Sequence, residues 1–422
     1  MASLKPVCKY GSSCYRKNPH HLSQYCHVGS ELETASSSEK KRSRRTDEEQ
    51  SSPVDEITDC DKCVTNSGDT PLTKRSKLCD DLPKEIEPVS ASTNSGSQDN
   101  EELTNESSDV TVRENIKRQF LVGMPEDFYQ LWEFCKSLHP SQPEGVLKPS
   151  LGLELVGPYH VLGGRLMGVP WEKCVLHYRF LYDPPEFQTV MIKSGTNTDG
   201  YHIGYFRDDP KSTQCLVVSN CAEKGCDIAI EGDSLFSALR YQLADALKHK
   251  RLSSAKKTLL QDLSSKLRAF MAKSAIPELT PSVNDLWKQR NKQIVASCFH
   301  KIGIVVPYNK KTELGYRPLT MTDRELKRLL NKIANCSDEG ARDKLSEPLQ
   351  EIVTYVQFAN DECDYGMGLE LGLDLFFHGN QYFHTLIGHL LPVAYDLLQR
   401  EQFGRISTEH LKQRSQLLDC TL

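Results

Sequence analysis

The sequence predicts an α+β protein: a mostly helical core with a small antiparallel sheet, preceded by a disordered linker and a small amino-terminal module. Apolar residues recur at helical spacing through the carboxyl half, as in Leu235, Leu239, Leu243 and Leu247. Short β-prone runs separated by Pro, Gly, Asp and Asn turns occupy residues 150–232. Cysteines and histidines crowd the start of the chain, and a polar segment poor in aromatic residues follows them.

A chain of 422 residues is long enough for two or three domains and their connections. We expect four segments: the module at 1–29, the disordered linker at 30–112, a helix-plus-sheet subdomain at 113–250 and a helical subdomain at 251–422. The linker carries a basic run at 40–45, which indicates nuclear import, nucleic-acid contact or only a solvated charge cluster. Cys60 and Cys63 form a C-x-x-C without a second pair nearby, and we interpret them as incidental.

The composition argues against several classes of protein. The net charge is −5, so the chain is not basic throughout, as a protein that coats DNA would be. It contains no run of 18 apolar residues and no signal-peptide core, so we expect no contact with a membrane. Fifteen cysteines, scattered and odd in number, are typical of a reducing compartment.

Residues 5–27 hold the ligand types of a tetrahedral zinc site, thiols and imidazoles, in a segment too short to bury a core. A metal would have to hold such a module together. Cys8 and Cys14 are spaced more widely than the cysteines of a common C2H2 finger. His20 and Cys26 are alternative ligands by type, and a metal-free tail with chance Cys and His residues is the other interpretation.

The same segment resembles the poly(ADP-ribose)-binding zinc finger, whose pattern is C-x-[F/Y]-G-x-x-C, then a basic pair, then two spaced histidines. The matching residues are Cys8, Tyr10, Gly11, Cys14, Arg16, Lys17, His21, Tyr25 and His27. The resemblance implies a zinc ion bound by Cys8, Cys14, His21 and His27. It also implies that ADP-ribose is bound by Tyr10, Tyr15 and Arg16, since aromatic faces stack on adenine and a guanidinium pairs with pyrophosphate.

Local patterns predict the elements of the larger segments. The strands are expected at 175–182, 189–192, 202–206, 215–218 and 228–230. Helices are predicted to start at Pro125, which two acids follow, and near Thr322, which is a capping residue. A further helix is predicted over residues 283–295, and 302–307 is a short buried strand or an extended crossing.

A glycine-punctuated acidic break is predicted late in the chain. A helix with apolar residues at 345, 349, 352, 353 and 356 leads into three acids within four positions, Asp361, Glu362 and Asp364. Three weak helix formers follow at Gly366, Gly368 and Gly372, and an apolar helix resumes with Leu369. Such a break puts carboxylates at the rim of a packed scaffold, where chemistry or a partner contact would lie. A solvated helix cap is the alternative.

Asp361 and Glu362 are adjacent, so on a helix their side chains diverge by about 100° and are not expected to form a catalytic dyad. One of them would face a substrate or partner while the other anchors the turn. Arg317 follows Gly315 and precedes Pro318 on a predicted loop. It is either an idle surface residue or is held against a carboxylate such as that of Glu362, whose rotamer it would then fix.

Residues 113–422 resemble the histone PARylation factor family, the accessory subunits of DNA-damage-activated poly(ADP-ribose) polymerases. The resemblance rests on the block at 353–372 and on three shorter motifs: Gly315-Tyr-Arg, Asn380-Gln-Tyr-Phe-His and Leu390-Leu-Pro-Val-Ala-Tyr. Many members of the family lack the amino-terminal finger and the long linker. The coupling of a finger to this core is therefore inferred from this sequence alone.

The resemblance implies a nuclear protein, on chromatin at sites of DNA damage, that docks on the polymerase catalytic domain. Glu362 is implied to be the catalytic acid that enters the polymerase active site, with Asp361, Tyr316, Arg317 and Phe358 at the contact. The polymerase would hold NAD, and Glu362 would be the general base that directs ADP-ribose to serine on histones and on the polymerase. We expect a monomer when free, and no enzyme activity from this chain alone.

Two other functions remain open. The chain would be a poly(ADP-ribose)-reading adaptor if only the finger acts and the core has no catalytic role. It would be an ADP-ribosyl hydrolase if Asp361 and Glu362 cut the sugar bond, although hydrolases hold their carboxylates about 5 Å or more apart across a bound sugar. A nucleotide-binding enzyme is the least favoured reading, because no Gly-rich loop of Walker or dinucleotide form occurs.

Overall fold

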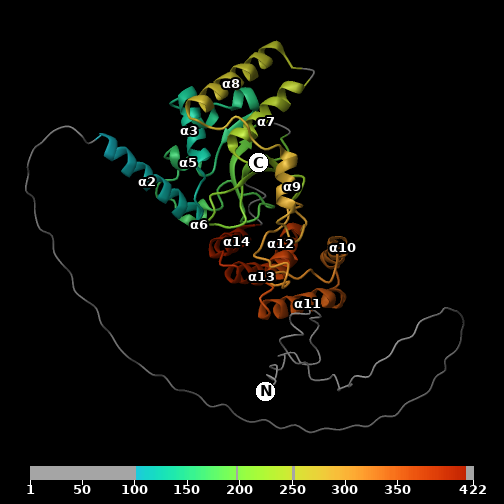
Figure 1. Ribbon diagram of the computed structural model, residues 1–422. Coiled ribbons are helices and arrows are strands. Elements are labelled where there is room, and N and C mark those ends of the chain that lie inside the picture. Colours follow the sequence, from blue (N-terminus) through green and yellow to red (C-terminus); the bar gives the residue numbers. More distant parts are fainter. Residues whose placement is uncertain (1–100, 196–197, 250–251, 415–422) are drawn as a thin grey trace, which may run out of the picture. The chain divides into compact units, whose positions relative to one another are not determined.

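The computed structural model describes residues 101–195, 198–249 and 252–414, with side chains from Thr111 onward (Figure 1). This part of the chain belongs to one compact unit that starts at Asn100. The finger, most of the predicted linker, the basic run, Cys60 and Cys63 lie outside the described residues. The predicted subdomain boundary near residue 250 stays a prediction.

Five short strands form one antiparallel sheet, in which each strand pairs with the next along the chain. They are β1 (Leu153–Leu155), β2 (Phe187–Lys193), β3 (Tyr201–Phe206), β4 (Leu216–Cys221) and β5 (Ala229–Gly232). Strands β2 to β5 confirm four of the five predicted runs, and together with the helices they confirm the α+β class. The central strands are almost wholly buried, so the sheet lies in the interior.

The strand predicted at 175–182 is wrong, because this segment folds into turns. Arg179 donates from Nε to the carbonyl of Val175 at 2.9 Å, and from Nη1 to the carbonyls of Pro184 and Phe187 at 2.7 and 2.9 Å. These local bonds draw the segment into a compact turn instead of an extended strand. Strand β1 was not predicted, since three residues are too few to show alternation.

The helices of the first half come before and after β1 in the chain. They are α2 (Glu101–Phe120), α3 (Glu126–Leu138), α4 (Lys148–Leu151), α5 (Tyr159–Leu162) and α6 (Trp171–Cys174), with the 3-10 turn η2 (Pro143–Gly145). Helix α2 begins inside the segment predicted as linker. Helix α3 begins after Pro125, as predicted, and buries Phe128, Leu131 and Phe134 against the core.

Three helices follow the sheet: α7 (Leu235–Lys248), α8 (Ser254–Lys273) and α9 (Val283–Asn291). Helices α7 and α9 pack on β5, and α8 packs on α4 and α7 (Figure 1). Helix α9 ends four residues earlier than the predicted end at Val295, because the amide of Val295 donates to the carbonyl of Ile304 at 3.0 Å. Residues 302–307 are therefore the extended crossing that was predicted, with an isolated bridge between Ala296 and Ile304.

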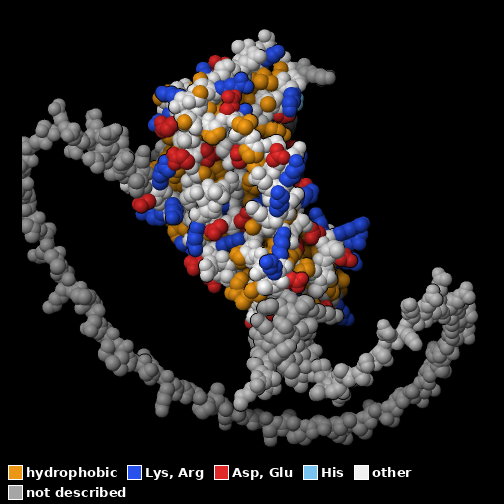
Figure 2. Space-filling view, in the orientation of Figure 1, with side chains coloured by type: hydrophobic (Ala, Val, Ile, Leu, Met, Phe, Trp, Pro, Cys, Tyr) orange, Lys and Arg blue, Asp and Glu red, His pale blue; other side chains and the backbone are white. Residues whose placement is uncertain are grey.

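The last elements are α10 (Asp323–Ala334), α11 (Glu339–Asp361), α12 (Gly366–His378), α13 (His384–Leu397) and α14 (Glu401–Gln413), with the 3-10 turn η3 (Gln381–Phe383). Helix α10 starts at the predicted cap, where Thr322 and Glu325 form a capping box. Its outer face exposes Arg324, Lys327, Arg328 and Lys332, and Figure 2 shows Lys and Arg side chains gathered where this helix lies.

Helix α12 is the central helix of this half. It packs against α10, α11 and α13, and its residues from Gly366 to Phe377 are all buried. The three glycines predicted to punctuate the acidic break lie inside this helix, which corrects that prediction. A Cβ atom added at Gly372 would stand 2.6 Å from the side chain of Leu391, so the missing side chain lets α13 approach closely. None of the described helices combines the length and apolar character of a membrane span.

Candidate functional site

The acidic break is a Schellman turn at the end of α11. Glu362 is the C-cap residue, and Cys363 follows in the left-handed conformation at φ 64°. The amide of Asp364 donates to the carbonyl of Ala359 at 2.8 Å, and the amide of Cys363 donates to that of Asn360 at 3.1 Å. These bonds turn the chain sharply between α11 and α12 and fix the backbone at Glu362.

Arg317 joins the two acids on either side of Cys363. Its Nη2 atom donates to Asp364 Oδ2 at 2.8 Å and also to Glu362 Oε2. The side chains of Arg317, Glu362 and Asp364 are 15%, 8% and 2% exposed, so water screens these pairs less than a surface ion pair. The guanidinium also offsets the repulsion of a carboxylate by the carbonyl end of a helix. Of the two interpretations left open for Arg317, the structure therefore supports the contact with a carboxylate, here Glu362, over an idle surface residue.

The loop that carries Arg317 is fastened to the turn through its backbone. The amide of Gly315 donates to Asp364 Oδ1 at 3.0 Å, and its carbonyl accepts from the amide of Gly366 at 3.0 Å. Gly315 has a φ of 111°, and a Cβ atom there would collide with the carbonyl of Pro307. Asp364 therefore binds the loop through both a backbone amide and a guanidinium.

Tyr316 lies between Gly315 and Arg317 in the loop, and its hydroxyl donates to Glu370 Oε2 at 3.1 Å. Burial and the Glu370 carboxyl raise the pKa of Tyr316. Burial also raises the pKa of Glu370 to about 7, against the opposing effect of the Tyr316 hydroxyl. Helix α12 thus holds the loop at a second point, beyond the hydrogen bond from Gly366.

The other predicted contact residues lie on α11. The carbonyl of Phe358 accepts from the amide of Glu362 at 3.1 Å, and the Phe358 side chain is half-buried. Asp361 is exposed at the end of the helix. Among the described residues, the structure therefore gathers the predicted Tyr316, Arg317, Phe358, Asp361 and Glu362 around one turn. The predicted zinc and ADP-ribose residues of the finger, Cys8, Tyr10, Cys14, Tyr15, Arg16, His21 and His27, lie outside the described residues.

Sequence reasoning gave no role to Asp364 or Glu370. Asp364 was only one of three neighbouring acids, although it accepts from both the Gly315 amide and Arg317 of the loop. A structural role for Glu370 could have been predicted, because an acid inside the apolar run of α12 is a buried polar group that needs a partner.

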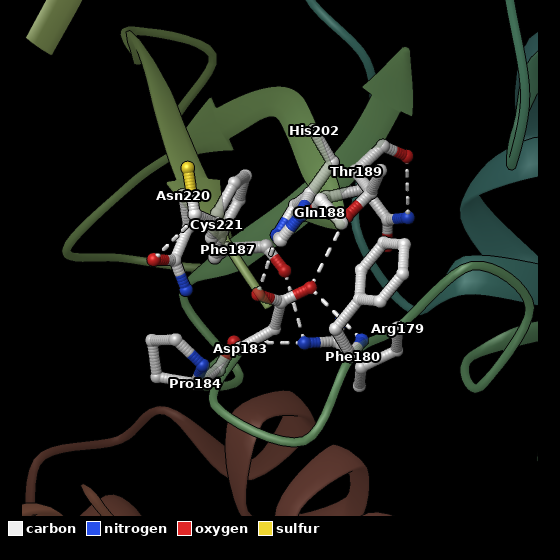
Figure 3. A network of polar contacts seen from close by, with 11 residues as sticks. Arg179, Phe180, Asp183, Pro184, Phe187, Gln188, Thr189, His202, Asn220 and Cys221 are labelled. Atoms are coloured by element: carbon white, nitrogen blue, oxygen red, sulfur yellow. Dashed lines mark hydrogen bonds and ion pairs between the residues drawn. The ribbon is translucent and has the colours of Figure 1, made fainter. Parts of the chain in front are cut away.

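A second polar network lies in the sheet half (Figure 3). The side chains of His202 and Asp183 are fully buried, and His202 Nε2 lies 2.8 Å from Asp183 Oδ1. Asp183 Oδ2 accepts from the amide of Phe180 and the hydroxyl of Thr189, and His202 Nδ1 lies 2.7 Å from the carbonyl of Gly200. Both imidazole nitrogens are engaged and neither residue reaches solvent. We therefore interpret this pair as structural: it binds the turn before β2 to the sheet.

Two sets of residues have metal-binding chemistry. In the described part of the chain, Asp323, Glu370 and Asp374 each offer a carboxylate oxygen within 4.8 Å of the others. In the finger, two thiols and two imidazoles are the donor set that tetrahedral zinc prefers.

The fold and the turn define a class: an α+β protein in which a junction between two helices presents an ion-paired carboxylate on a fixed turn. Residues 111–414 match the family described as Histone PARylation factor 1, and residues 5–30 match the PBZ domain. The chain belongs to the histone PARylation factor 1 family and carries a PBZ zinc finger domain at its amino terminus.

Curated relatives agree with this family. The chain is 44% identical over 309 residues to Histone PARylation factor 1 of Mus musculus, which covers 72% of this chain and 87% of the mouse protein. It is 41% identical over 309 residues to the Danio rerio protein of that name, covering 72% and 86%. The Putative histone PARylation factor 1-like protein of Homo sapiens is 41% identical over 318 residues, with the same two coverages. The predicted family is confirmed.

Proposed function

We propose that this chain is an accessory factor for a DNA-damage-activated poly(ADP-ribose) polymerase and completes the polymerase active site with Glu362. The observation that supports this most is the contact of Arg317 with both Glu362 and Asp364 on a Schellman turn. A carboxylate held this way keeps one orientation, and a positioned carboxylate is what proton transfer to a partner-bound substrate requires. Membership of a family named for histone PARylation supports the same proposal.

In the proposed reaction the polymerase holds NAD, and its nicotinamide is the leaving group. A serine Oγ forms a bond to C1′ of the ribose as the bond between C1′ and nicotinamide breaks. The transition state resembles an oxocarbenium ion, as in glycoside chemistry. The serine proton passes to the Glu362 carboxylate, which acts as a general base. The products are ADP-ribosyl serine, nicotinamide and a proton.

Arg317 contributes geometry to this step. A guanidinium stabilises the charged form of a carboxylate and so does not make it a stronger base. It does restrict the rotamer of Glu362, which lowers the entropic cost of orienting the carboxylate toward the serine hydroxyl. Exposed Asp361, together with Tyr316 and half-buried Phe358, supplies the contact with the polymerase, where an acid would meet a basic group.

The acceptors in this proposal are serines of histones and of the polymerase itself, and the place of action is chromatin at DNA damage in the nucleus. The finger would bind zinc through Cys8, Cys14, His21 and His27 and hold polymer through Tyr10, Tyr15 and Arg16. A finger on a long linker raises the local concentration of the core at polymer already made. The free chain is proposed to be a monomer.

A reconstituted assay tests the proposal. It contains a polymerase catalytic domain, NAD and a histone peptide with one serine, with or without this chain. The Glu362→Gln variant keeps the shape of the side chain and removes the base, so we expect serine modification to fall by about 10²-fold or more at unchanged binding. The matched control is Glu347→Gln, an exposed acid on the same helix, which should behave as wild type.

The same assay separates the alternatives. If Glu362→Gln supports serine modification as well as wild type does and binds the polymerase equally, the general-base role is wrong and an adaptor role is favoured. Release of ADP-ribose from modified histone by this chain, with polymerase omitted, would favour the hydrolase.

A further inference from the structure

Helix α10 carries a row of exposed cations on the side that faces away from the core. Its buried residues are Leu326, Leu330 and Ile333, and the helix packs against α11 and α12. The cations are three, four or eight positions apart, which places them near one another on the helix surface: Arg324, Lys327, Arg328 and Lys332. At about 1.5 Å per residue, the row is about 12 Å long.

No acid forms an ion pair with this row. Throughout the part of the chain that the structure describes, none of the four cations is paired with a carboxylate. The two acids of α10 belong to its first turn and are bound elsewhere. Glu325 Oε2 accepts from the amide and the hydroxyl of Thr322 at 3.0 and 2.8 Å. Asp323 Oδ2 accepts from the hydroxyl of Ser297 at 2.8 Å.

Several exposed lysines on other helices are paired with an acid one turn away. These pairs are Lys136 with Glu133, Lys266 with Asp262, Lys288 with Asp285, and Lys412 with Glu409. A helix that leaves four cations unpaired along one side concentrates a positive field there, although the whole chain has a net charge of −5. The exposed face of α10 is therefore suited to an anionic partner.

The anion that fits this face is the backbone of duplex DNA. About 12 Å of duplex axis carries about seven phosphates, so a straight row of cations can contact several of them at once. Contacts of Lys and Arg with phosphate need no pocket and read no base. Polymers with unpaired bases bind through aromatic stacking as well, and α10 has no aromatic residue. The ring of Phe299, 5.6 Å from Lys327 Nζ, is buried and cannot stack on a base.

We propose that the exposed face of α10 binds the phosphate backbone of duplex DNA without regard to sequence. The row begins close to the candidate site, because Asp323 at the start of α10 brings a carboxylate oxygen within 4.8 Å of Glu370, which binds Tyr316 of the 315–319 loop. DNA on this row holds the Glu362 turn near acceptors that are themselves on DNA. The proposal goes beyond the proposed function, since it needs neither the polymerase nor Glu362.

The test is the salt dependence of DNA affinity, measured with the full chain and a short fluorescent duplex. Each phosphate contact contributes about 0.9 to the slope of log Kd against log salt concentration. The α10 variant combines Arg324→Gln, Lys327→Gln, Arg328→Gln and Lys332→Gln. Its slope should be lower than that of wild type by about 2 to 3.6, and its affinity in about 0.1 M NaCl at least tenfold weaker. The finger and the basic run at 40–45 are the same in both chains, so their contribution cancels in the difference.

A matched control removes the same charge from α8. It combines Lys257→Gln, Lys266→Gln, Arg268→Gln and Lys273→Gln, all at exposed positions. These four lie on opposite sides of their helix, and two of them are paired with Asp262 and Glu278, so the slope should change by less than half as much. The α10 variant should unfold at the wild-type urea midpoint. Should its midpoint be lower, the single variants Arg328→Gln and Lys332→Gln decide the question, since each should lower the slope by about 0.9.

Three results would overturn the proposal. One is an equal slope for wild type and the α10 variant. Another is an equal fall for the α8 variant, because net charge and not the α10 face would then be responsible. The third concerns poly(ADP-ribose), tested in chains that also carry Tyr10→Ala and Arg16→Ala: a larger loss of affinity for polymer than for duplex would make polymer the partner of this face.

The proposed function is tested separately. A chain that binds duplex DNA through α10 but never supports serine modification would retain this proposal and contradict the proposed function alone. A chain that supports serine modification through Glu362 while its α10 variant binds DNA as wild type does would contradict only the DNA contact.

Discussion

Arg317 and Asp364 form an ion pair at 2.8 Å, and the nitrogen that makes it also binds Glu362. Asp364 is 1% exposed and lies inside the turn, whereas Glu362 is the C-cap residue of α11, with a side chain that is 8% exposed. One guanidinium therefore connects a structural acid to the acid proposed to act. A substitution of Arg317 or Asp364 is therefore expected to alter the orientation of the Glu362 side chain.

Replacing Arg317 with Gln should weaken both the fold and the function. Two carboxylates would face each other without a cation, and we expect a loss of about 1–3 kcal/mol of unfolding free energy at pH 7. Urea unfolding measures this loss, and polymerase affinity should fall at the same time. The control is Arg324→Gln on the exposed face of α10, expected within about 0.5 kcal/mol of wild type. A stable Arg317→Gln chain with normal affinity would contradict the importance of this cluster.

Replacing Gly315 with Ala should displace the loop. The φ of 111° is unfavourable for any L-residue, and the new Cβ atom would meet the Pro307 carbonyl. We expect a cost of about 2 kcal/mol or more, together with faster exchange of the Gly366 amide. Gly340→Ala is a suitable control, because a Cβ at that helical position has only ordinary contacts. Equal melting temperatures for the two variants would show that the close approach is unimportant.

Replacing Cys363 with Gly should be tolerated, and replacing it with Val should not. The residue sits at φ 64°, where glycine carries no steric penalty and a β-branched side chain a large one. We expect Cys363→Gly to change the unfolding free energy by no more than about 1 kcal/mol, in the stabilising direction. Cys363→Val should lose about 1 kcal/mol or more. The reverse order in a denaturant titration would refute this reading of the turn.

The stability of the chain should depend on the protonation of Glu186. Burial raises its pKa from 4.5 to about 7, so the folded chain binds more protons than the unfolded chain between these values. Its contribution to unfolding free energy is therefore constant below about pH 4.5, falls as pH rises to 7, and is level above that. The limit for this one group is on the order of 3 kcal/mol. Melting curves of Glu186→Gln from pH 5 to 8 should lack this component of the wild-type decline.

Polymer binding should depend on the finger alone. Replacing Tyr10 and Arg16 together with Ala removes a stacking face and a pyrophosphate partner, so binding to poly(ADP-ribose) should fall at least tenfold. Chelation of zinc should have the same effect, because a segment as short as 5–27 cannot be held by a buried core. Serine modification in the purified assay should stay at the wild-type level. Equal polymer binding by the double variant would contradict the assignment of Tyr10 and Arg16.

Local patterns predicted much of this molecule because several signals were strong. Thr322 and Glu325 form a capping box that is readable from four residues, and the leucines of α7 repeat over three turns. The acidic break was also visible, because three acids within four positions follow an apolar pattern at helical spacing. The contact of Arg317 with Glu362 was one of two possibilities that the sequence left open, the other being an idle surface arginine.

Other features depend on contacts that no local pattern contains. Residues 175–182 look like a strand, but Arg179 binds carbonyls on either side of it and closes a turn. Gly366 and Gly372 look like helix breakers, and they lie within α12 because Tyr316 and Leu391 come close to them. The roles of Asp364 and Glu370 follow only from the return of the 315–319 loop to α12, which is a tertiary event.

The hydrogen bond from Gly315 to Asp364 joins residues 49 positions apart, with two complete helices between them. During synthesis, a ribosome-bound chain that has emerged only as far as α11 already contains Arg317 but has no anchor for it. The loop can close only after α12 has been made and has packed, so this contact surface is among the last parts of the molecule to mature. Truncation just before α12 would keep Glu362 and Arg317 in the chain but remove the helix that holds the 315–319 loop.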